Sequence, residues 1–232
     1  MTDNPASNSG AVRPWLAGEP LAEPHRAAYR RLANAIRHTI GLLMETRAEA
    51  VDLTAAAAQL ERWNARLARS PHDRPMWSFA EASTSGDPRA LYDTSPLSGP
   101  ANPLAPPMEL RLEGVEVIAT ATFGIAYEGP PGHVHGGFVA AAFDEVLGMV
   151  QSTAGNPGMT GTLSVRYRRP TPLHRELVFR GRVDRVEGRK IFTTATLHAG
   201  EALCAEAEAI FISVGDEHFR QLAAAAGREI AT

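Results

Sequence analysis

The chain has 232 residues, of which 44% are hydrophobic and 21% charged, and its formal net charge is −3 at pH 7. This length provides one core of ordinary size with room for an extension or a second small domain. The slightly negative charge argues against a general nucleic-acid-binding protein. The single cysteine, Cys204, excludes an internal disulfide framework and a cysteine-rich metal site, and it is compatible with a reducing compartment.

No targeting or membrane segment is predicted. Residues 1–10 are polar and lack the basic start and the apolar core of a secretory signal peptide. No apolar run approaches the ~20 residues that span a bilayer. We therefore expect a cytoplasmic protein without membrane insertion.

Two amphipathic helices are predicted between Leu21 and about Arg69, and residues 1–70 are interpreted as a helical N-terminal extension. Apolar residues recur there at three- and four-residue steps, at Tyr29, Leu32, Ile36, Ile40 and Leu43 and again at Leu53, Leu60, Trp63 and Leu67. The charged residues between them are typical of a solvated face. The functional alternative is a lid or a dimer-contact hairpin.

Residues 71–107 are rich in Pro, Gly and Ser and are predicted to form a long irregular connection. A connection of this length is typically a linker or a ligand-contacting segment. Its large apolar side chains, Trp77 and Phe79, are expected to pin it to the core or to line a ligand tunnel.

Residues 108–214 carry strand patterns on both sides of one helix. The runs 108–113 and 115–123 alternate apolar and polar residues as a hairpin does. Residues 135–150 form a helix that is apolar nearly all round, which places it inside the protein. Strands follow at 162–168, 177–186, 190–198 and 202–214, with short turn signals between the last three. The predicted fold class is α+β, with one long helix on an antiparallel sheet, and residues 215–232 are expected to be a terminal helix or a frayed tail.

Two adjacent carboxylates, Asp144 and Glu145, lie in this apolar helix. An unpaired buried carboxylate is costly, so each requires a hydrogen-bonding partner or a catalytic role. Adjacent helical residues point about 100° apart, so the two cannot serve the same site. At the head of the helix, Gly136 and Gly137 let a ligand approach the backbone, and the first amides have no partner inside the helix. Such amides suit an oxyanion or a thioester carbonyl.

The sequence His135-Gly136-Gly137, with a carboxylate nine positions after the histidine, resembles the hotdog-fold acyl-CoA thioesterases of the phenylacetate-pathway (PaaI-like) and THEM-like group. The resemblance covers roughly residues 96–214 and includes the Asn-Pro segment within 98–107 and the strand segment 160–173. It implies that residues 108–214 form a hotdog thioesterase domain, in which a curled antiparallel sheet wraps around one long central helix. The implied reaction is hydrolysis of an acyl-CoA to a free carboxylic acid and CoA.

The resemblance also implies roles for individual residues. Asp144 would act as general base or nucleophile, and the amide of Gly136 would polarise the thioester carbonyl. The imidazole of His135 would hold the loop or contact the substrate. Thr160, contributed by the partner subunit, would position the attack, with Thr162 as the alternative. The structural alternatives are an aspartate satisfied by a neighbouring hydroxyl and glycines that only form a tight turn.

A group of basic residues suits the 3′-phosphate and pyrophosphate of CoA, and it comprises Arg166, Arg168, Arg169, Arg189 and Lys190. Alternation places Arg166 and Arg168 on the polar face of their strand and Arg169 on the other face. Solvated strand residues are the plainer interpretation of each. No cofactor is implied, and the spacing of His133 and His135 lacks the further ligands of a metal site.

We expect a homodimer or a dimer of dimers, because a single hotdog leaves the site half built and a sheet edge unpaired. Two alternatives to the thioesterase remain open. One is a hotdog enoyl-thioester hydratase or dehydratase, and the other is a non-catalytic acyl-thioester-binding protein.

Overall fold

The structure is a computed structural model that describes residues 23–70, 94–106, 108–154, 158–213, 221 and 225. The predictions for Trp77 and Phe79 lie outside the described residues, as does nearly all of the predicted tail at 215–232. The domain boundaries at 70, 107 and 214 stay predictions. Within the described part of the chain, no helix is long and apolar enough to cross a membrane.

The described strands form one six-stranded antiparallel sheet in the order β1-β2-β4-β5-β6-β3. Their bounds are β1 Glu109–Glu113, β2 Glu116–Thr122, β3 Gly158–Tyr167, β4 Glu176–Glu187, β5 Lys190–Ala199 and β6 Ala202–Ser213. The β4–β5 and β5–β6 turns contain Gly188 and Gly200, whose φ angles of 57° and 59° suit a residue without a Cβ. β1 and β3 are the two edges of the sheet.

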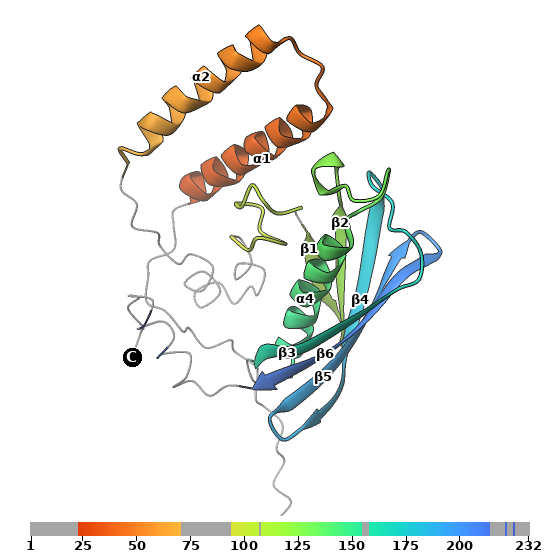
Figure 1. The fold of residues 1–232 in the computed structure, drawn as a ribbon. Coiled ribbons are helices and arrows are strands. Elements are labelled where there is room, and N and C mark those ends of the chain that lie inside the picture. The colour runs from red at the N-terminus through yellow and green to blue at the C-terminus, as the bar shows by residue number, and fades with distance from the viewer. Residues whose placement is uncertain are drawn as a thin grey trace, which may run out of the picture.

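Helix α4, Gly136–Ser152, lies against the hollow face of this sheet (Figure 1). Its inner side is fully buried at Phe143, whose ring meets Phe179 of β4 edge to face at 5.3 Å between centroids. The helix approaches β4 closely where that strand has no side chain, because a Cβ at Gly181 would stand 2.8 Å from Cγ2 of Val150. The predicted α+β arrangement, a curled antiparallel sheet around one long helix, is thus confirmed.

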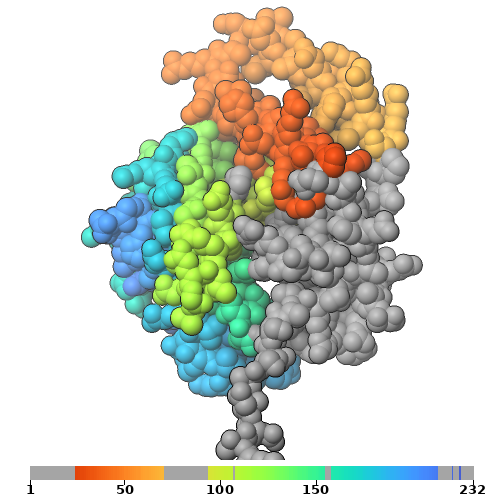
Figure 2. Space-filling model, turned by 180° about the vertical axis from the view of Figure 1, so that it is seen from behind, coloured from red at the N-terminus to blue at the C-terminus, as the bar shows by residue number. Residues whose placement is uncertain are grey.

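The two predicted N-terminal helices are present as α1, Glu23–Glu45, and α2, Ala50–Leu67. Figure 2 shows them projecting from the body formed by the strands, and α2 has no buried residue. Arg37 holds α1 to the segment 94–106, since its guanidinium donates to the carbonyl oxygens of Ala105 at 2.7 Å and Asn102 at 2.9 Å. α1 is therefore attached to the sheet domain through this segment, which lies between α1 and α4 in Figure 1.

Tyr127 fixes the other side of the segment 94–106. Its hydroxyl donates to the carbonyl of Leu104 at 2.9 Å, and its ring meets Phe123 and Phe138 edge to face. Burial raises the pKa of Tyr127 to about 12, and the positive charge of Arg37 opposes part of that shift. The phenol is accordingly a permanent hydrogen-bond donor at neutral pH.

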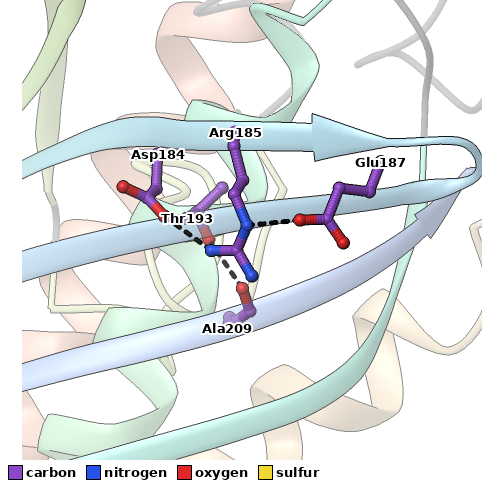
Figure 3. A network of polar contacts seen from close by, with 5 residues as sticks. All are labelled: Asp184, Arg185, Glu187, Thr193 and Ala209. Atoms are coloured by element: carbon purple, nitrogen blue, oxygen red, sulfur yellow. Dashed lines mark hydrogen bonds and ion pairs between the residues drawn. The ribbon is translucent and has the colours of Figure 1, made fainter.

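The hairpin of β4 and β5 carries a polar network on its exposed surface (Figure 3). Arg185 follows a register shift in β4 and binds the carboxylates of Asp184 at 2.7 Å and Glu187 at 2.6 Å. Its guanidinium also lies 3.7 Å from the ring centre of Phe192. Because the side chains are exposed, the ion pairs add little to stability. Their effect is local, since they hold both acidic groups beside the turn that leads to Arg189 and Lys190.

Candidate active site

The N-terminus of α4 is capped by His135, whose Nδ1 accepts a hydrogen bond from the amide of Gly137 at 3.0 Å. Nδ1 therefore carries no proton in this arrangement, and one of the first amides of the helix is satisfied. The amide of Gly136 has no hydrogen bond to any described residue. It lies at the positive end of the helix dipole and is available to a ligand oxygen.

Tyr167, at the end of β3, holds the same turn from the other side. Its hydroxyl donates to the carbonyl oxygen of Gly136 at 2.7 Å. This carbonyl and the amide of Gly137 belong to one peptide group, so that group is held by Tyr167 at one end and by His135 at the other. Tyr167 is not among the predicted site residues, although strand alternation places it with Leu163 and Val165 on the apolar face. The contact orients the peptide that follows the free amide.

Asp144 lies two turns further along α4, and its Oδ1 accepts a hydrogen bond from Oγ1 of Thr160 at 2.9 Å. A β-bulge separates Thr160 from Thr162, so that Thr160 pairs with the buried Phe211 and Thr162 with Ile210, which faces the other side of the sheet. Only Thr160 therefore faces α4. The alternative residue, Thr162, is directed away from the site.

The catalytic role of Thr160 stays a prediction, and the single chain places this residue beside Asp144 of the same chain. The resemblance implied a threonine from the partner subunit, whereas in the structure Thr160 binds Asp144 of its own chain. The physical reason is the path of β3, which pairs with β6 at the sheet edge and passes beside α4 in the same chain.

Glu145 is used for a different purpose. Its Oε1 accepts hydrogen bonds from the hydroxyls of Ser95, at 2.5 Å, and Ser98. Ser98 is buried, and both serines belong to the segment that Arg37 and Tyr127 hold. The two adjacent carboxylates thus have separate partners, as their angular separation on the helix predicts.

The predicted CoA-binding residues fall into two groups. Arg166, Arg168 and Arg169 lie at the end of β3 that is near Tyr167 and the start of α4. Arg166 pairs in register with Glu206, on the outer face of the sheet, and Arg168 forms an ion pair with Glu206 at 2.6 Å. Arg169 is exposed, and its amide donates to the carbonyl of Cys204 at 3.0 Å.

Arg189 and Lys190 lie at the opposite end of the sheet. The Nε of Arg189 donates to the carbonyl of Ser213, which pairs with Gly158 at the beginning of β3. Arg166, Arg168 and Arg169 lie at the far end of β3. Because the strand rises about 3.3 Å per residue, its length separates the two groups of basic residues by roughly 30 Å. One chain therefore does not gather the five basic residues into one cluster.

His133, two residues before His135, has its Nδ1 2.8 Å from the carbonyl oxygen of Pro131. Within the described part of the chain, no group of three or more His, Cys, Asp or Glu side chains is placed to hold a metal ion.

A family model described as "Thioesterase superfamily" matches residues 131–206, which include the turn before α4, α4 itself and β3. A crystal structure of a thioesterase superfamily protein is 34% identical, with a TM-score of 0.68, and the match covers 85% of this chain and 99% of that chain. The chain belongs to the thioesterase superfamily. This membership confirms the resemblance found in the sequence, and the hotdog fold with it.

Curated relatives of this thioesterase superfamily chain are similar over a shorter stretch. Acyl-coenzyme A thioesterase THEM4 of Xenopus laevis is 37% identical over 89 residues, which are 38% of this chain and 40% of that protein. THEM4 of Mus musculus is 34% identical over 96 residues, which are 40% of this chain and 41% of that protein. The matched part of the chain spans about two fifths of the length of these relatives.

Proposed function

We propose that this protein is an acyl-CoA thioesterase, which hydrolyses an acyl-CoA thioester to a free carboxylic acid and CoA. The observation that supports this most directly is the pairing of Asp144 with Thr160, on the helix whose first amide, at Gly136, is free among the described residues. A carboxylate can activate water or attack the carbonyl carbon, and a free helix-terminal amide can stabilise the oxyanion of thioester hydrolysis. Superfamily membership and the relatives named acyl-coenzyme A thioesterase support the same reaction class.

In the proposed mechanism, the Gly136 amide donates a hydrogen bond to the thioester carbonyl oxygen and stabilises the negative charge that develops there. Thr160 occupies Oδ1 of Asp144, so Oδ2 is left to accept a proton from water. The water oxygen bonds to the carbonyl carbon, the carbon–sulfur bond breaks, and the proton passes to the departing CoA sulfur. In the alternative mechanism, Asp144 attacks the carbonyl carbon directly, the carbon–sulfur bond breaks to release the CoA thiolate, and water then hydrolyses the resulting anhydride. His135 acts by holding the turn through its bond to Gly137.

A homodimer, alone or within a dimer of dimers, is part of this proposal. β3 is an edge strand, and most of its side chains are exposed, so its outer backbone groups are available for pairing with a second copy. An antiparallel pairing of two β3 strands brings the beginning of one beside the end of the other. The partner's Arg189 and Lys190 would then lie near Arg168 and Arg169, which would form one basic site for the phosphates of CoA.

The decisive measurement is thiol release from short, aromatic, medium and long acyl-CoAs, followed with a chromogenic thiol reagent. Asp144→Asn keeps the shape of the side chain and removes its charge, and we expect kcat to fall by about a hundredfold or more. Glu208→Gln is the matched control, since Glu208 lies exposed on β6 and pairs in register with Ser164. Circular dichroism and gel filtration establish that fold and assembly are retained.

Full activity in Asp144→Asn would refute the role of this residue. No turnover of any acyl-CoA by the native chain would refute the thioesterase and favour a binding protein. A change in enoyl absorbance without thiol release would favour the hydratase.

A further inference from the structure

We infer that the acyl group of the substrate lies along one side of α4, from Asp144 past Gly148 to Gln151, and that the preferred acyl groups carry a hydroxyl at their far end. This inference rests on the proposed function and adds the substrate class. The three residues are called the α4 strip below.

The α4 strip is defined by the geometry of the helix. Residues at positions i, i+4 and i+7 lie within about 60° of one another around an α-helix, so Asp144, Gly148 and Gln151 share one side. The opposite side, which includes Ala142 and Val146, is fully buried in the core. Seven residues at 1.5 Å each give about 10 Å between the two ends of the strip. This length accommodates a medium-chain acyl group.

Gly148 leaves space in the middle of the strip. A glycine inside a helix costs about 0.5–1 kcal/mol relative to alanine, so its presence calls for a reason. Close packing is the usual reason for a glycine inside an element. It holds for Gly181 of strand β4, where a Cβ would collide with Val150. At Gly148, by contrast, a Cβ would meet no described atom within 4 Å. Packing within the described chain therefore does not require this glycine, and we place the acyl group in the space beside it, which no described atom fills.

Gln151 provides an unpaired polar group at the end of the strip. Its side chain is only 6% exposed, and its Oε1 has no hydrogen-bond partner among the residues that the structure describes. Leaving such a group unsatisfied is costly, which indicates that a ligand completes it. Oε1 points toward the beginning of β3, because a Cβ at Gly158 would lie 3.1 Å from it. Two residues further along β3, Thr160 binds Asp144, so both ends of the strip face the same short segment.

The side-chain amide of Gln151 determines which ligand group can bind to it. A hydroxyl both donates and accepts hydrogen bonds, so it satisfies the Gln151 amide in either of its two orientations. With the thioester at Asp144, the hydroxyl belongs at the far end of the acyl chain. An unsubstituted alkyl chain of the same length would reach the amide and leave it unpaired.

The test compares kcat/KM for butyryl-CoA, octanoyl-CoA and the terminally hydroxylated octanoyl-CoA by thiol release. The native protein is expected to prefer the hydroxylated substrate over octanoyl-CoA by about tenfold. Gln151→Met keeps the length of the side chain without its amide, and it should remove or reverse this preference while butyryl-CoA turnover is unchanged. Gly148→Leu should reduce the turnover of both eight-carbon substrates tenfold or more and spare butyryl-CoA. Gly148→Ala, which creates no collision with a described atom, should shift the same ratio in the same direction by less.

Equal kcat/KM for the two eight-carbon substrates in the native protein would overturn the inference, as would a preference that Gln151→Met leaves unchanged. Loss of all three activities together in both Gly148 variants, or dissociation of the dimer, would show that protein fills the space and would also overturn it. The absence of thiol release from every acyl-CoA would instead overturn the proposed function together with this inference. Turnover without the expected ratios overturns the inference alone.

Discussion

The hydroxyl of Thr160 provides a sharp test of the site. Thr160→Val replaces this hydroxyl by a methyl group of similar size and removes the 2.9 Å hydrogen bond to Asp144. A hydrogen bond to a charged group contributes about 1.5–3 kcal/mol, which corresponds to roughly a 10- to 150-fold effect on rate. Because Thr160 is exposed in the single chain, water can replace part of this interaction. We therefore expect the lower end of the range, about tenfold.

The expected loss is in kcat, with KM little changed, because Thr160 holds the carboxylate and the substrate is bound elsewhere. Thr160→Ser retains the hydroxyl and should stay within about threefold of the native rate. Thr162→Val is the matched control, since the same replacement is made on the opposite face of the sheet. Thiol release measured over a range of substrate concentrations gives kcat and KM for all three variants.

Two results would refute this reasoning. Native kcat in Thr160→Val would show that the hydrogen bond to Asp144 has no part in the reaction. An equal loss in Thr162→Val would show that the effect comes from β3 as a whole.

Two further predictions concern the segment 94–106. Glu145→Gln weakens the charge-assisted hydrogen bonds from Ser95 and Ser98 and should lower the free energy of unfolding by about 1–3 kcal/mol in urea denaturation; an unchanged midpoint and slope would contradict this role. Burial raises the pKa of Tyr127 to about 12, so the folded chain favours the neutral phenol. The stability this gives is complete below the ordinary tyrosine pKa near 10 and is lost as the pH rises toward 12. In an absorbance titration of the tyrosines, Tyr127→Phe should remove the tyrosine that ionises at the highest pH. If all four tyrosines of the native protein ionise together near pH 10, the raised pKa of Tyr127 is contradicted.

Local patterns in the sequence predicted the elements of the fold. The apolar run of α4 and the alternation in β2, β4, β5 and β6 are set by burial on one side of each element, which recurs at a fixed period. The sequence also indicated that Asp144 and Glu145 need partners, because these two carboxylates interrupt an apolar helix and are costly to bury unpaired. Both residues have the hydrogen-bonding partners that the argument requires.

Contacts between residues far apart in the sequence were harder to predict. Strict alternation places Thr160 and Thr162 on the same face of the strand, so it cannot distinguish them. The β-bulge between them breaks the two-residue period and turns only Thr160 toward Asp144. The contact of Tyr167 with Gly136 depends on where the end of a strand meets the start of a helix. Proximity in sequence also grouped basic residues that the sheet places at opposite ends.

The two neighbouring carboxylates of α4 connect the N-terminal extension to the site. Arg37 holds α1 to the segment 94–106, and Ser95 and Ser98 of that segment hold Glu145. Because backbone hydrogen bonds make one turn of helix rigid, a fixed direction for Glu145 also fixes the direction of Asp144, about 100° away. The segment therefore restrains the rotation of α4 on one side while Thr160 restrains Asp144 on the other. In this arrangement Glu145, which binds the segment 94–106, is adjacent to Asp144, so α1 is connected to the proposed catalytic carboxylate through that segment and the backbone of α4.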